Sequence, residues 1–590
     1  MALRTYRPRV ARLSSTIRSS LRAFLAVSVF AASAAVASSC SLVIDGDAES
    51  CTEDADCVNH PGLTKCDTEA GVCITPDTCT SNTECADGEI CTFVSPRACR
   101  SLLSERCATV YPDDPAIYLS DDSILIGVTA PLTEGGEASS TGVSILNSAI
   151  LAVSEINQSG GANGQRPMAL LACDDTGDSN LAEANGQTLA DLGIQAILGP
   201  AFSGQTLAMT KGTPLDPDVE GDIGSDGTVK RGVLNMSSSA TSTEITGIKD
   251  EAPSCAGEEG CPGLVWRTSP SDLIQGAAMV EYFPALQDIA LARVEPPRTQ
   301  VKVVILHKGD SYGRNLANFV QERLLVNGKL AINNSTDALK LDYGDTSQAG
   351  VEPDADIIQQ AIDFRADVYI LIGTNELGTA TDPDASPGVM QQIEEGWSDP
   401  TANSEPYYLF ADGGLIAEVE NAATTTGARL RVRGTVPGTK GEMTSPVGLY
   451  SGRYDQMFPG DEGAPTVFGG AGAYDTIYLL AYSVAAANGA PMTGEQFARG
   501  LLRMNDGEGI EVGPPKFGSA NNTLQNGGSI NFIGASGPLD FDVVAGEAES
   551  DIQIWCINSS NKGEFSGLFY SASFEGMEGD DDVAGECPFP

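Results

Sequence analysis

The sequence has few of the residues on which most enzyme active sites depend. It contains only two histidines, His60 and His307, which are far apart in the chain. A zinc centre built on a histidine cluster is therefore excluded, and a Ser-His-Asp triad would have to use His307. A phosphate-binding Gly-x-x-x-x-Gly-Lys-Ser/Thr loop is not present. The paired acids Asp174 and Asp175 lack the oxygen-rich loop spacing of a calcium site. We therefore expect no enzyme, no metal site and no cofactor.

Positive charge is also scarce. The chain has 34 Lys and Arg residues against 80 Asp and Glu residues, which gives a formal net charge of −46. A protein with this charge repels nucleic acids and anionic lipid surfaces, so neither is an expected partner. With 41% hydrophobic residues over 590 positions, the chain can still bury sizeable cores in more than one domain.

Long apolar runs are nearly absent, and the exception lies at the N-terminus. Residues 23–36 form an apolar stretch of about 14 residues, which is too short for a membrane-spanning helix. A basic region precedes it, and it contains Arg4, Arg7, Arg9, Arg12, Arg18 and Arg22. We interpret residues 1–39 as a signal peptide, so the protein is expected to be exported to the periplasm or cell envelope.

Two cleavage sites compete in this signal peptide. Ala35-Val36-Ala37 fits the small-x-small rule of ordinary secretion. Residues 37–40, Ala-Ser-Ser-Cys, resemble a bacterial lipoprotein box, although Ala37 stands where Leu is usual. The chain has 15 cysteines, so lipidation of Cys40 would leave an even number for disulfides. We therefore favour a lipid anchor at Cys40.

Cysteines are concentrated just after the signal peptide. The eight between positions 51 and 99 divide into two similar units, each of which opens with Cys-Thr and has its next Cys six positions on. We interpret residues 40–110 as a tandem repeat of a small disulfide-stapled module. A stalk that spaces the main domain from the membrane is the default role, and binding is the alternative, between which the sequence does not choose. The alternative, a metal site, is weaker because no close Cys-x-x-Cys pair occurs and His60 is the only nearby histidine.

All fourteen cysteines after Cys40 are expected to form disulfides. Cys255 and Cys261 bracket a short acidic loop, Cys556 and Cys587 could tie down the C-terminal tail, and Cys107 would then be left for Cys173. Sequence alone does not fix the connectivity. The full set is Cys51, Cys57, Cys66, Cys73, Cys79, Cys85, Cys91, Cys99, Cys107, Cys173, Cys255, Cys261, Cys556 and Cys587.

From about residue 121 onward the pattern is α/β. Residues 124–128 form an apolar strand pattern, residues 142–157 have helical periodicity, and a second strand and helix pattern follows before residue 203. A second series of this kind begins at residue 301, with further strands at 368–372 and 407–410. This alternation predicts parallel sheets with crossover helices, in two lobes separated by a cleft. Ligands bind such sheets in the crevice at the carboxyl ends of the strands.

Short motifs along residues 121–545 resemble the type I periplasmic binding proteins, specifically the branched-chain amino-acid (Leu/Ile/Val) receptor family. They include Pro131-Leu132-Thr133, Gly199-Pro200 with Ser203, Ser239-Ala240-Thr241, Asp310-Ser311-Tyr312-Gly313 and Ala473-Tyr474-Asp475. The resemblance implies two Rossmann-like lobes with parallel central sheets, joined by a three-stranded hinge, within residues 111–590. We expect the first lobe to comprise about 121–265 and 436–500, and the second about 270–435 and 501–560.

The same resemblance implies a ligand site on the first lobe. In the family, a hydroxyl after the Gly-Pro turn and a Ser/Ala-x-Thr loop bind the carboxylate of the ligand. Ser203, Ser239, Ala240 and Thr241 occupy those positions here. The alternative for Ser203 is a cap of the following helix, and the alternative for Ser239 and Thr241 is a polar turn.

On the second lobe, the family places a Tyr before Gly in the cleft and an acidic residue opposite the ligand ammonium. Tyr312 and Asp412 match these positions. The alternatives are packing between the lobes for Tyr312 and an ordinary Asp-Gly-Gly turn for Asp412.

Two functions remain open. The first is a solute-binding protein that captures an amino acid or similar small carboxylate and delivers it to an ABC importer, with the permease as its protein partner. The second is a sensing or interaction lipoprotein that uses the same two lobes without transport.

Overall fold

The computed structural model describes residues 51–587, except 53–56, 58–64, 68–71, 75–78, 93–96, 135–136, 214–222, 294–297, 349–350, 379–386, 398–403, 439–442, 461–463 and 581–586. The predicted signal peptide and Cys40 lie outside the described residues.

The first lobe is built on an eight-stranded sheet, six of whose strands run parallel. The two antiparallel strands lie at its edges. The apolar run that begins at Ile124 is an inner strand with both neighbours paired. In spatial order the strands are β22 (Phe541–Asp542), β23 (Glu547–Ala548), β12 (Val265–Arg267), β11 (Leu234–Ser237), β10 (Ala196–Leu198), β6 (Ile124–Ala130), β9 (Met168–Asp174) and β5 (Thr109–Tyr111).

The second lobe is built on another eight-stranded sheet. Its first five strands run parallel, and three C-terminal antiparallel strands extend it. In spatial order the strands are β16 (Ala338–Asp342), β13 (Val303–His307), β17 (Val368–Ile372), β18 (Tyr407–Phe410), β19 (Val432–Pro437), β24 (Ile552–Ile557), β25 (Gly563–Ser571) and β26 (Gly576–Glu578). The two mostly parallel sheets confirm the predicted fold class.

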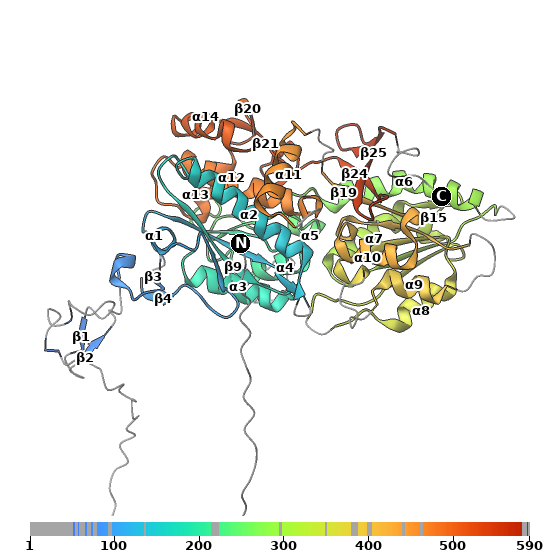
Figure 1. The fold of residues 1–590 in the computed structure, drawn as a ribbon, viewed down its shortest axis with the longest axis horizontal. Helices are drawn as coiled ribbons and strands as arrows, with labels where there is room; N and C mark the ends of the chain where they lie inside the picture. The colour runs from blue at the N-terminus through green and yellow to red at the C-terminus, as the bar shows by residue number, and fades with distance from the viewer. Residues whose placement is uncertain are drawn as a thin grey trace, which may run out of the picture. The chain divides into compact units, whose positions relative to one another are not determined.

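Helices cover both faces of each sheet (Figure 1). In the first lobe, α2 (Ser140–Gln158) and α12 (Gly470–Ala486) pack on one face, and α3 (Ser179–Asp191) and α4 (Ser203–Lys211) lie on the other. In the second lobe, α6 (Asp272–Arg293) and α7 (Ser311–Arg323) cover one face. The opposite face is covered by α8 (Ala355–Phe364), α9 (Val389–Gly396) and α10 (Ala417–Thr426).

The packing interface between α2 and α12 contains a buried polar cluster. The Glu155 carboxylate accepts hydrogen bonds from the hydroxyls of Tyr474, at 2.5 Å, and Tyr478, at 2.8 Å. Arg453 of α11 (Pro446–Met457) pairs with the same carboxylate at 2.8 Å. Since each polar group has a partner, this cluster fixes the register of two otherwise apolar helices.

The chain crosses between the two sheets three times. The crossings run from β12 to α6, from β19 to α11, and from β23 to β24. These three connections form the expected hinge. They allow the lobes to open and close while each sheet stays intact.

The C-terminal part of the chain is divided between the two lobes at a different position from the expected one. Residues 501–560 were assigned above to the second lobe, but the structure places 508–548 on the first. Strands β20 (Glu508–Glu511) and β21 (Ile530–Ile533) and helix α14 (Pro514–Gln525) pack with α12 in the core of the first lobe. Asp475 of α12 holds the following loop by accepting the N–H groups of Ala535 and Ser536 at 2.8 and 2.7 Å. Only from Ile552 does the chain join the second sheet.

The cysteine repeats share one disulfide pattern. In each unit the first cysteine pairs with the third and the second with the fourth, which gives Cys51–Cys66, Cys57–Cys73, Cys79–Cys91 and Cys85–Cys99. Several of these sulfur atoms lie within 4.8 Å of one another, but each belongs to a disulfide and cannot act as a thiolate ligand. The predicted disulfides are therefore present in both repeats.

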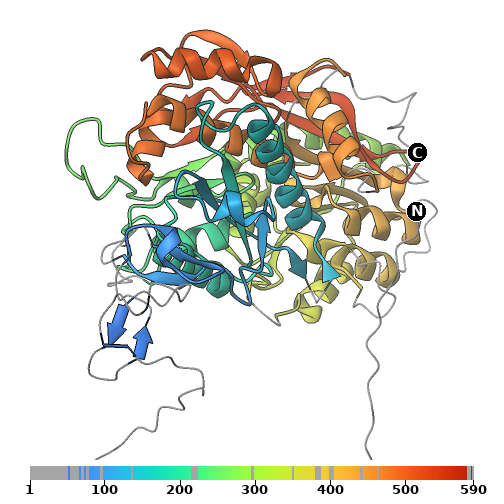
Figure 2. The same ribbon diagram turned by 60° about the vertical axis from the view of Figure 1, so that its left-hand side comes forward.

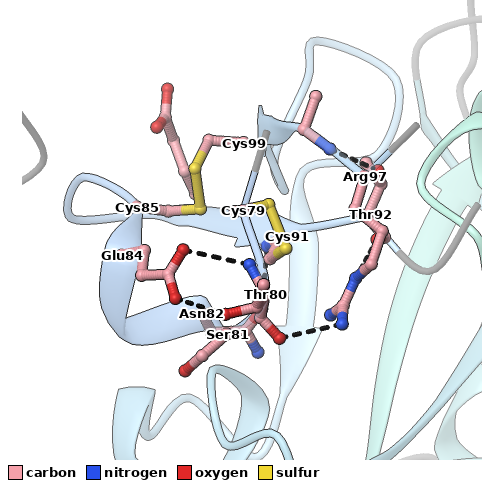
Figure 3. Close-up of a disulfide and its surroundings, with 12 residues drawn as sticks. Cys79, Thr80, Ser81, Asn82, Glu84, Cys85, Cys91, Thr92, Arg97 and Cys99 are labelled. Atoms are coloured by element: carbon pink, nitrogen blue, oxygen red, sulfur yellow. Dashed lines mark hydrogen bonds between the residues drawn. A yellow bond between two sulfur atoms is a disulfide. The ribbon is translucent and has the colours of Figure 1, made fainter. Parts of the chain in front are cut away.

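The second repeat is braced by hydrogen bonds around its two disulfides (Figure 3). The Glu84 carboxylate accepts the Thr80 N–H at 3.0 Å and its hydroxyl, and Arg97 donates to the carbonyls of Thr80 and Thr92 at 2.8 and 2.9 Å. Its two short strands are β3 (Glu89–Cys91) and β4 (Cys99–Ser101).

This second repeat also belongs to the first lobe, so residues up to 110 are not all a free stalk. Ile90 and Leu102 pack into the same core as strand β9. Figure 2 shows the ribbon of this N-terminal part, in blue, beside the first lobe. The Asn82 side chain donates to the Leu119 carbonyl at 3.0 Å. Cys107 and Cys173 form a disulfide that joins the repeat to β9.

The last two cysteine pairs are Cys255–Cys261 and Cys556–Cys587. Together with Cys107–Cys173, these are the pairings considered from the sequence.

No helix in the described part of the chain has the length and apolarity needed to cross a membrane.

Candidate functional site

A cavity of about 480 Å³, partly open to solvent, lies between the two lobes. Five of the six residues predicted to contact a ligand line it, and the sixth, Ala240, does not. Their role in binding stays a prediction, but the fold does bring them together from both sheets. The lining residues are Thr141, Phe202, Ser203, Ser239, Thr241, Asp310, Tyr312, Thr374, Asn375, Asp412, Gly413, Ile416, Val467 and Phe468.

Ser203 presents a hydrogen-bond donor to the cavity. It is the first residue of α4 and is only 2% exposed. Its Oγ accepts the N–H groups of Thr241 and Ser242 at 3.2 and 3.1 Å. A serine hydroxyl has two acceptor lone pairs and one proton, so its remaining capacity is one donor. No acceptor for that proton occurs among the described residues. Ser203 does not cap α4, since the N-cap position is Phe202.

The polar groups of the loop after β11 differ in their hydrogen-bond partners, although the resemblance implied that all of them contact the ligand. Thr241 Oγ1 is buried and has no hydrogen-bond partner of normal geometry among the residues described. The Ser239 hydroxyl instead donates to the Ala201 carbonyl at 2.7 Å, so its proton is engaged within the lobe. The Ala240 N–H donates to Ser237 Oγ at 3.0 Å and also points away from the ligand space. Ser203 is therefore the uncommitted donor of the first lobe, whereas the Thr241 hydroxyl lies toward the Asp272 carboxyl and lowers its pKa.

Arg267 holds the loop after β11 in position through hydrogen bonds to its backbone. Its guanidinium donates to the carbonyls of Ala240 and Ser242 at 3.3 and 3.0 Å, and it pairs with Glu547 of β23. Because its donors are used inside the lobe, Arg267 positions the loop and does not face the cavity.

Asp412 supplies the acidic side of the cavity. It lies in a single 3₁₀ turn (Asp412–Gly414) after β18 and is 3% exposed. Its Oδ1 accepts hydrogen bonds from the hydroxyl of Tyr312 and from the Gln275 amide, the latter at 3.0 Å. Burial raises the pKa of Asp412 to about 6, and the hydrogen bonds limit that rise. The turn predicted from Asp-Gly-Gly is present, and the fold places its carboxylate beneath the cavity.

A second carboxyl, Asp272, lies behind this pair at the start of α6. It is 1% exposed, and neither of its oxygens has a hydrogen-bond partner of normal geometry among the described residues. Burial, and next the charge of Asp412, raise its pKa well above the usual range. The neutral form of Asp272 is thus favoured, while Asp412 titrates near neutral pH.

Lys308 and its acidic neighbours form a separate charge group at the cavity edge. Lys308 Nζ lies 3.6 Å from an Asp310 oxygen and donates to Thr374 Oγ1 at 3.2 Å. Burial alone would raise the pKa of Glu376, but Lys308 and hydrogen bonds from Tyr343 and Thr374 hold it below its usual range. Lys308 is therefore balanced locally, and its ammonium lies 5.5 Å from the ring centroid of Phe202 on the other lobe.

The apolar part of the lining was not predicted. Phe202, Ile416 and the adjacent pair Val467 and Phe468 come from three separate segments, and Thr141 comes from the first turn of α2. None of these residues carries a motif of its own. The Phe202 position, between the Gly-Pro turn and Ser203, is the one that the neighbouring motif could have indicated.

The lobes contact each other at several points. The Asn315 amide of α7 donates to Ser242 Oγ and to Glu244, each at 3.1 Å. Ser140 Oγ donates to Glu418 at 3.1 Å, and the Ser179 N–H donates to the Ser347 carbonyl at the same distance. These contacts hold the two lobes together in a closed arrangement around a cavity that stays partly open to solvent.

Comparison with known proteins agrees with this architecture. A family described as periplasmic binding protein matches residues 123–214. The Leu/Ile/Val-binding protein homolog 1 of Brucella abortus is 25% identical over 314 residues, which are 50% of this chain and 73% of that protein. The Leu/Ile/Val-binding protein BraC3 of Rhizobium johnstonii is 30% identical over 128 residues, 22% of this chain and 30% of that protein.

Among solved structures, the branched-chain amino-acid transporter substrate-binding protein LivJ of Streptococcus pneumoniae, in complex with isoleucine, shares the fold. Its TM-score is 0.51 at 18% identity, with 75% of this chain and 99% of that chain covered. The chain therefore shares the fold of that structure, and residues 123–214 match the periplasmic binding protein family.

Proposed function

We propose that the cavity binds an amino acid, or a closely related small carboxylate, and that the protein delivers this solute to an ABC importer. The observation that carries the proposal is the polarity of the cavity. The uncommitted donor Ser203 and the buried hydroxyl of Thr241 lie on one lobe, and an ionisable acid, Asp412, lies on the other. A zwitterion satisfies both ends at once.

The carboxylate of the solute would lie against the first lobe. The Ser203 hydroxyl has only its proton left to offer, and the Thr241 hydroxyl has no partner of normal geometry within the described chain. Ser203 is the first residue of α4, where the partial positive charge of a helix N-terminus favours an anion, and the Thr241 N–H donates to its Oγ. Neutral donors of this kind bind a carboxylate without burying a permanent opposite charge.

The ammonium group would face Asp412 and Tyr312. Its arrival opposite Asp412 would favour the ionised carboxylate and offset the cost of burying it. The side chain would lie among Phe202, Ile416 and Phe468, which suits an apolar amino acid. The relatives named for Leu, Ile and Val binding support this class of solute.

Isothermal titration with leucine and with isocaproate, the same molecule without its amino group, tests the proposal. Leucine should bind more tightly, and Ser203→Ala combined with Thr241→Val should weaken it by roughly ten- to a hundredfold, the value of one strong hydrogen bond to a charged group. Thr425→Val removes a hydroxyl from the exposed side of α10 and is the control. If the double variant binds leucine as tightly as the Thr425→Val protein, the site is wrong.

Delivery to an importer rests on the relatives and on the sequence at the N-terminus. We propose export through residues 1–39 and a lipid anchor at Cys40, which would hold the binding domain beside a membrane permease. Labelled palmitate should be incorporated into the protein and lost in Cys40→Ala. Incorporation that persists in that variant would refute the anchor.

Sensing is the second candidate, and one observation favours it. The second cysteine repeat is built into the first lobe by Cys107–Cys173 and by the shared core, so movement of that lobe would be transmitted to the N-terminal segment. Uptake of leucine by host cells that lack the protein distinguishes the two. Reduced uptake supports transport, whereas normal uptake with a lost transcriptional response supports sensing.

A further inference from the structure

A second cavity lies where the three crossings between the lobes meet. It holds about 620 Å³ of space, partly open to solvent, and residues of all three crossings line it: Thr268 and Pro270, Pro437 and Gly438, and Ser550. It is separate from the cleft described above, although Val467 and Phe468 line both.

Two hydroxyls in this cavity have no partner. Ser238 Oγ and Thr268 Oγ1 are buried, at 2% and 3% exposure of their residues, and neither makes a hydrogen bond within the described chain. Unsatisfied buried hydroxyls are uncommon because each costs free energy. Both belong to residues that line the cavity, so an occupant there is the available partner.

The start of α12 adds backbone donors to the same wall. Gly469 occupies the N-cap position and provides no side-chain cap, and Gly469, Ala471 and Gly472 all line the cavity. A Cβ at Gly472 would lie 2.4 Å from Thr268 Oγ1, so the hydroxyl approaches the first turn of the helix closely because this residue is glycine. The uncapped N–H groups and the two hydroxyls therefore form one patch of donors.

The other residues that line this cavity disfavour a charged occupant. No Asp, Glu, Lys, Arg or His lines this cavity among the residues that the structure describes. Burying an ion without an opposite charge is costly, whereas a neutral oxygen can accept from the donor patch. Val436, Val447, Phe468 and Phe565 supply apolar surface for a compact hydrocarbon body.

We propose that this hinge cavity is a second binding site, for a small uncharged molecule that has a hydrogen-bond-accepting oxygen and a compact apolar body. Short aliphatic amides have this chemistry. The carbonyl oxygen lies against Ser238, Thr268 and the start of α12, and the alkyl group lies against the valine and phenylalanine side chains. An occupant bridges the three crossings and stabilises the closed arrangement of the lobes.

Isobutyramide is the probe for this site, used with the full chain. It should raise the thermal unfolding temperature saturably, and crystals soaked in it should show it beside Thr268. Val447→Phe fills the cavity from α11 and should abolish both results, whereas Leu449→Phe makes the same kind of change at an exposed position of that helix and should preserve them. Thr268→Val should weaken the probe by roughly tenfold, and Thr425→Val should leave it unchanged.

Three outcomes would overturn the proposal. One is the absence of any saturable shift. Another is probe found in the cleft beside Ser203 with the hinge cavity holding only water. The third is equal binding by the Val447→Phe and Leu449→Phe proteins. None of these measurements uses an amino acid, so failure here is distinguishable from failure of the proposed function of the cleft.

Discussion

Single polar groups in the cleft differ in what they can still bind, although their residue types are similar. The hydroxyls of Ser203 and Ser239 lie on the same lobe, but one has a free proton and the other donates to Ala201. The difference comes from the neighbours, because two N–H groups saturate the lone pairs of Ser203. A ligand role therefore follows from the partners of a hydroxyl and not from the presence of serine.

The raised pKa of Asp412 predicts that leucine affinity depends on pH. The folded pKa is about 6, above the ordinary value of 3.8, so protons stabilise the empty folded state and this contribution is lost as pH rises through that window. An ammonium ligand needs the ionised form. Leucine affinity should therefore fall by roughly tenfold between pH 7 and pH 5, because protonation competes with binding. Isocaproate should not lose affinity in this way, since it has no ammonium.

Titration calorimetry at several pH values, on wild type and Asp412→Asn, checks this prediction. The variant should bind leucine weakly at every pH and show a flat profile. Asp363→Asn, an exposed change on α8, should keep the wild-type profile. A pH profile in Asp412→Asn that matches wild type would assign the titration to another group.

At the scale of elements, α7 contributes to both the site and the closure of the lobes. Its first turn presents Tyr312 to the cavity, and one turn later Asn315 reaches Ser242 and Glu244 on the first lobe. The same helix therefore connects ligand contact with the contact between lobes. Movement of the second lobe would change both together.

Asn315→Ala should favour the open form. Removing two hydrogen bonds between the lobes, each worth about 1 kcal/mol, should accelerate leucine dissociation by roughly five- to thirtyfold with little effect on folding. Stopped-flow dissociation measures this directly. Asn318→Ala is the matched control, because that side chain lies exposed on the same helix and accepts only from Lys340 of the same lobe. Equal dissociation rates in the two variants would exclude Asn315 from closure.

For the whole molecule, the disulfide between the second repeat and β9 is the main covalent constraint on the N-terminal part. Cys107 and Cys173 are 66 positions apart, whereas Cys255 and Cys261 are six apart. The entropy of loop closure predicts that the first disulfide stabilises the fold by about 4 kcal/mol and the second by about 2 kcal/mol.

Paired Cys→Ser variants test this difference. Urea unfolding should show a larger loss of stability for the Cys107→Ser, Cys173→Ser protein than for the Cys255→Ser, Cys261→Ser protein. Similar midpoints in the two variants would show that the Cys107–Cys173 link does not restrain the unfolded chain as proposed.

Local patterns predicted many of the elements. The apolar runs at 368–372 and 407–410 are β17 and β18 with the expected ends, because short inner strands are flanked by polar residues. Residues 508–548 were placed in the wrong lobe, since their own pattern does not say which sheet they pack against. Contacts with α12 decide it. Likewise, Thr141 and Phe468 line the cleft only because distant segments meet there.

The sequence by itself determined the two α/β series, the cysteine repeats and the candidate polar residues, because strand periodicity, turn residues and cysteine spacing are local properties. The tertiary structure decided which hydroxyls remain uncommitted, which lobe the C-terminal segment joins, and how the second repeat is attached. It also created the hinge cavity, where three crossings meet. These features depend on contacts between residues far apart in the chain, and hydrogen-bond saturation and burial are settled only when those contacts form.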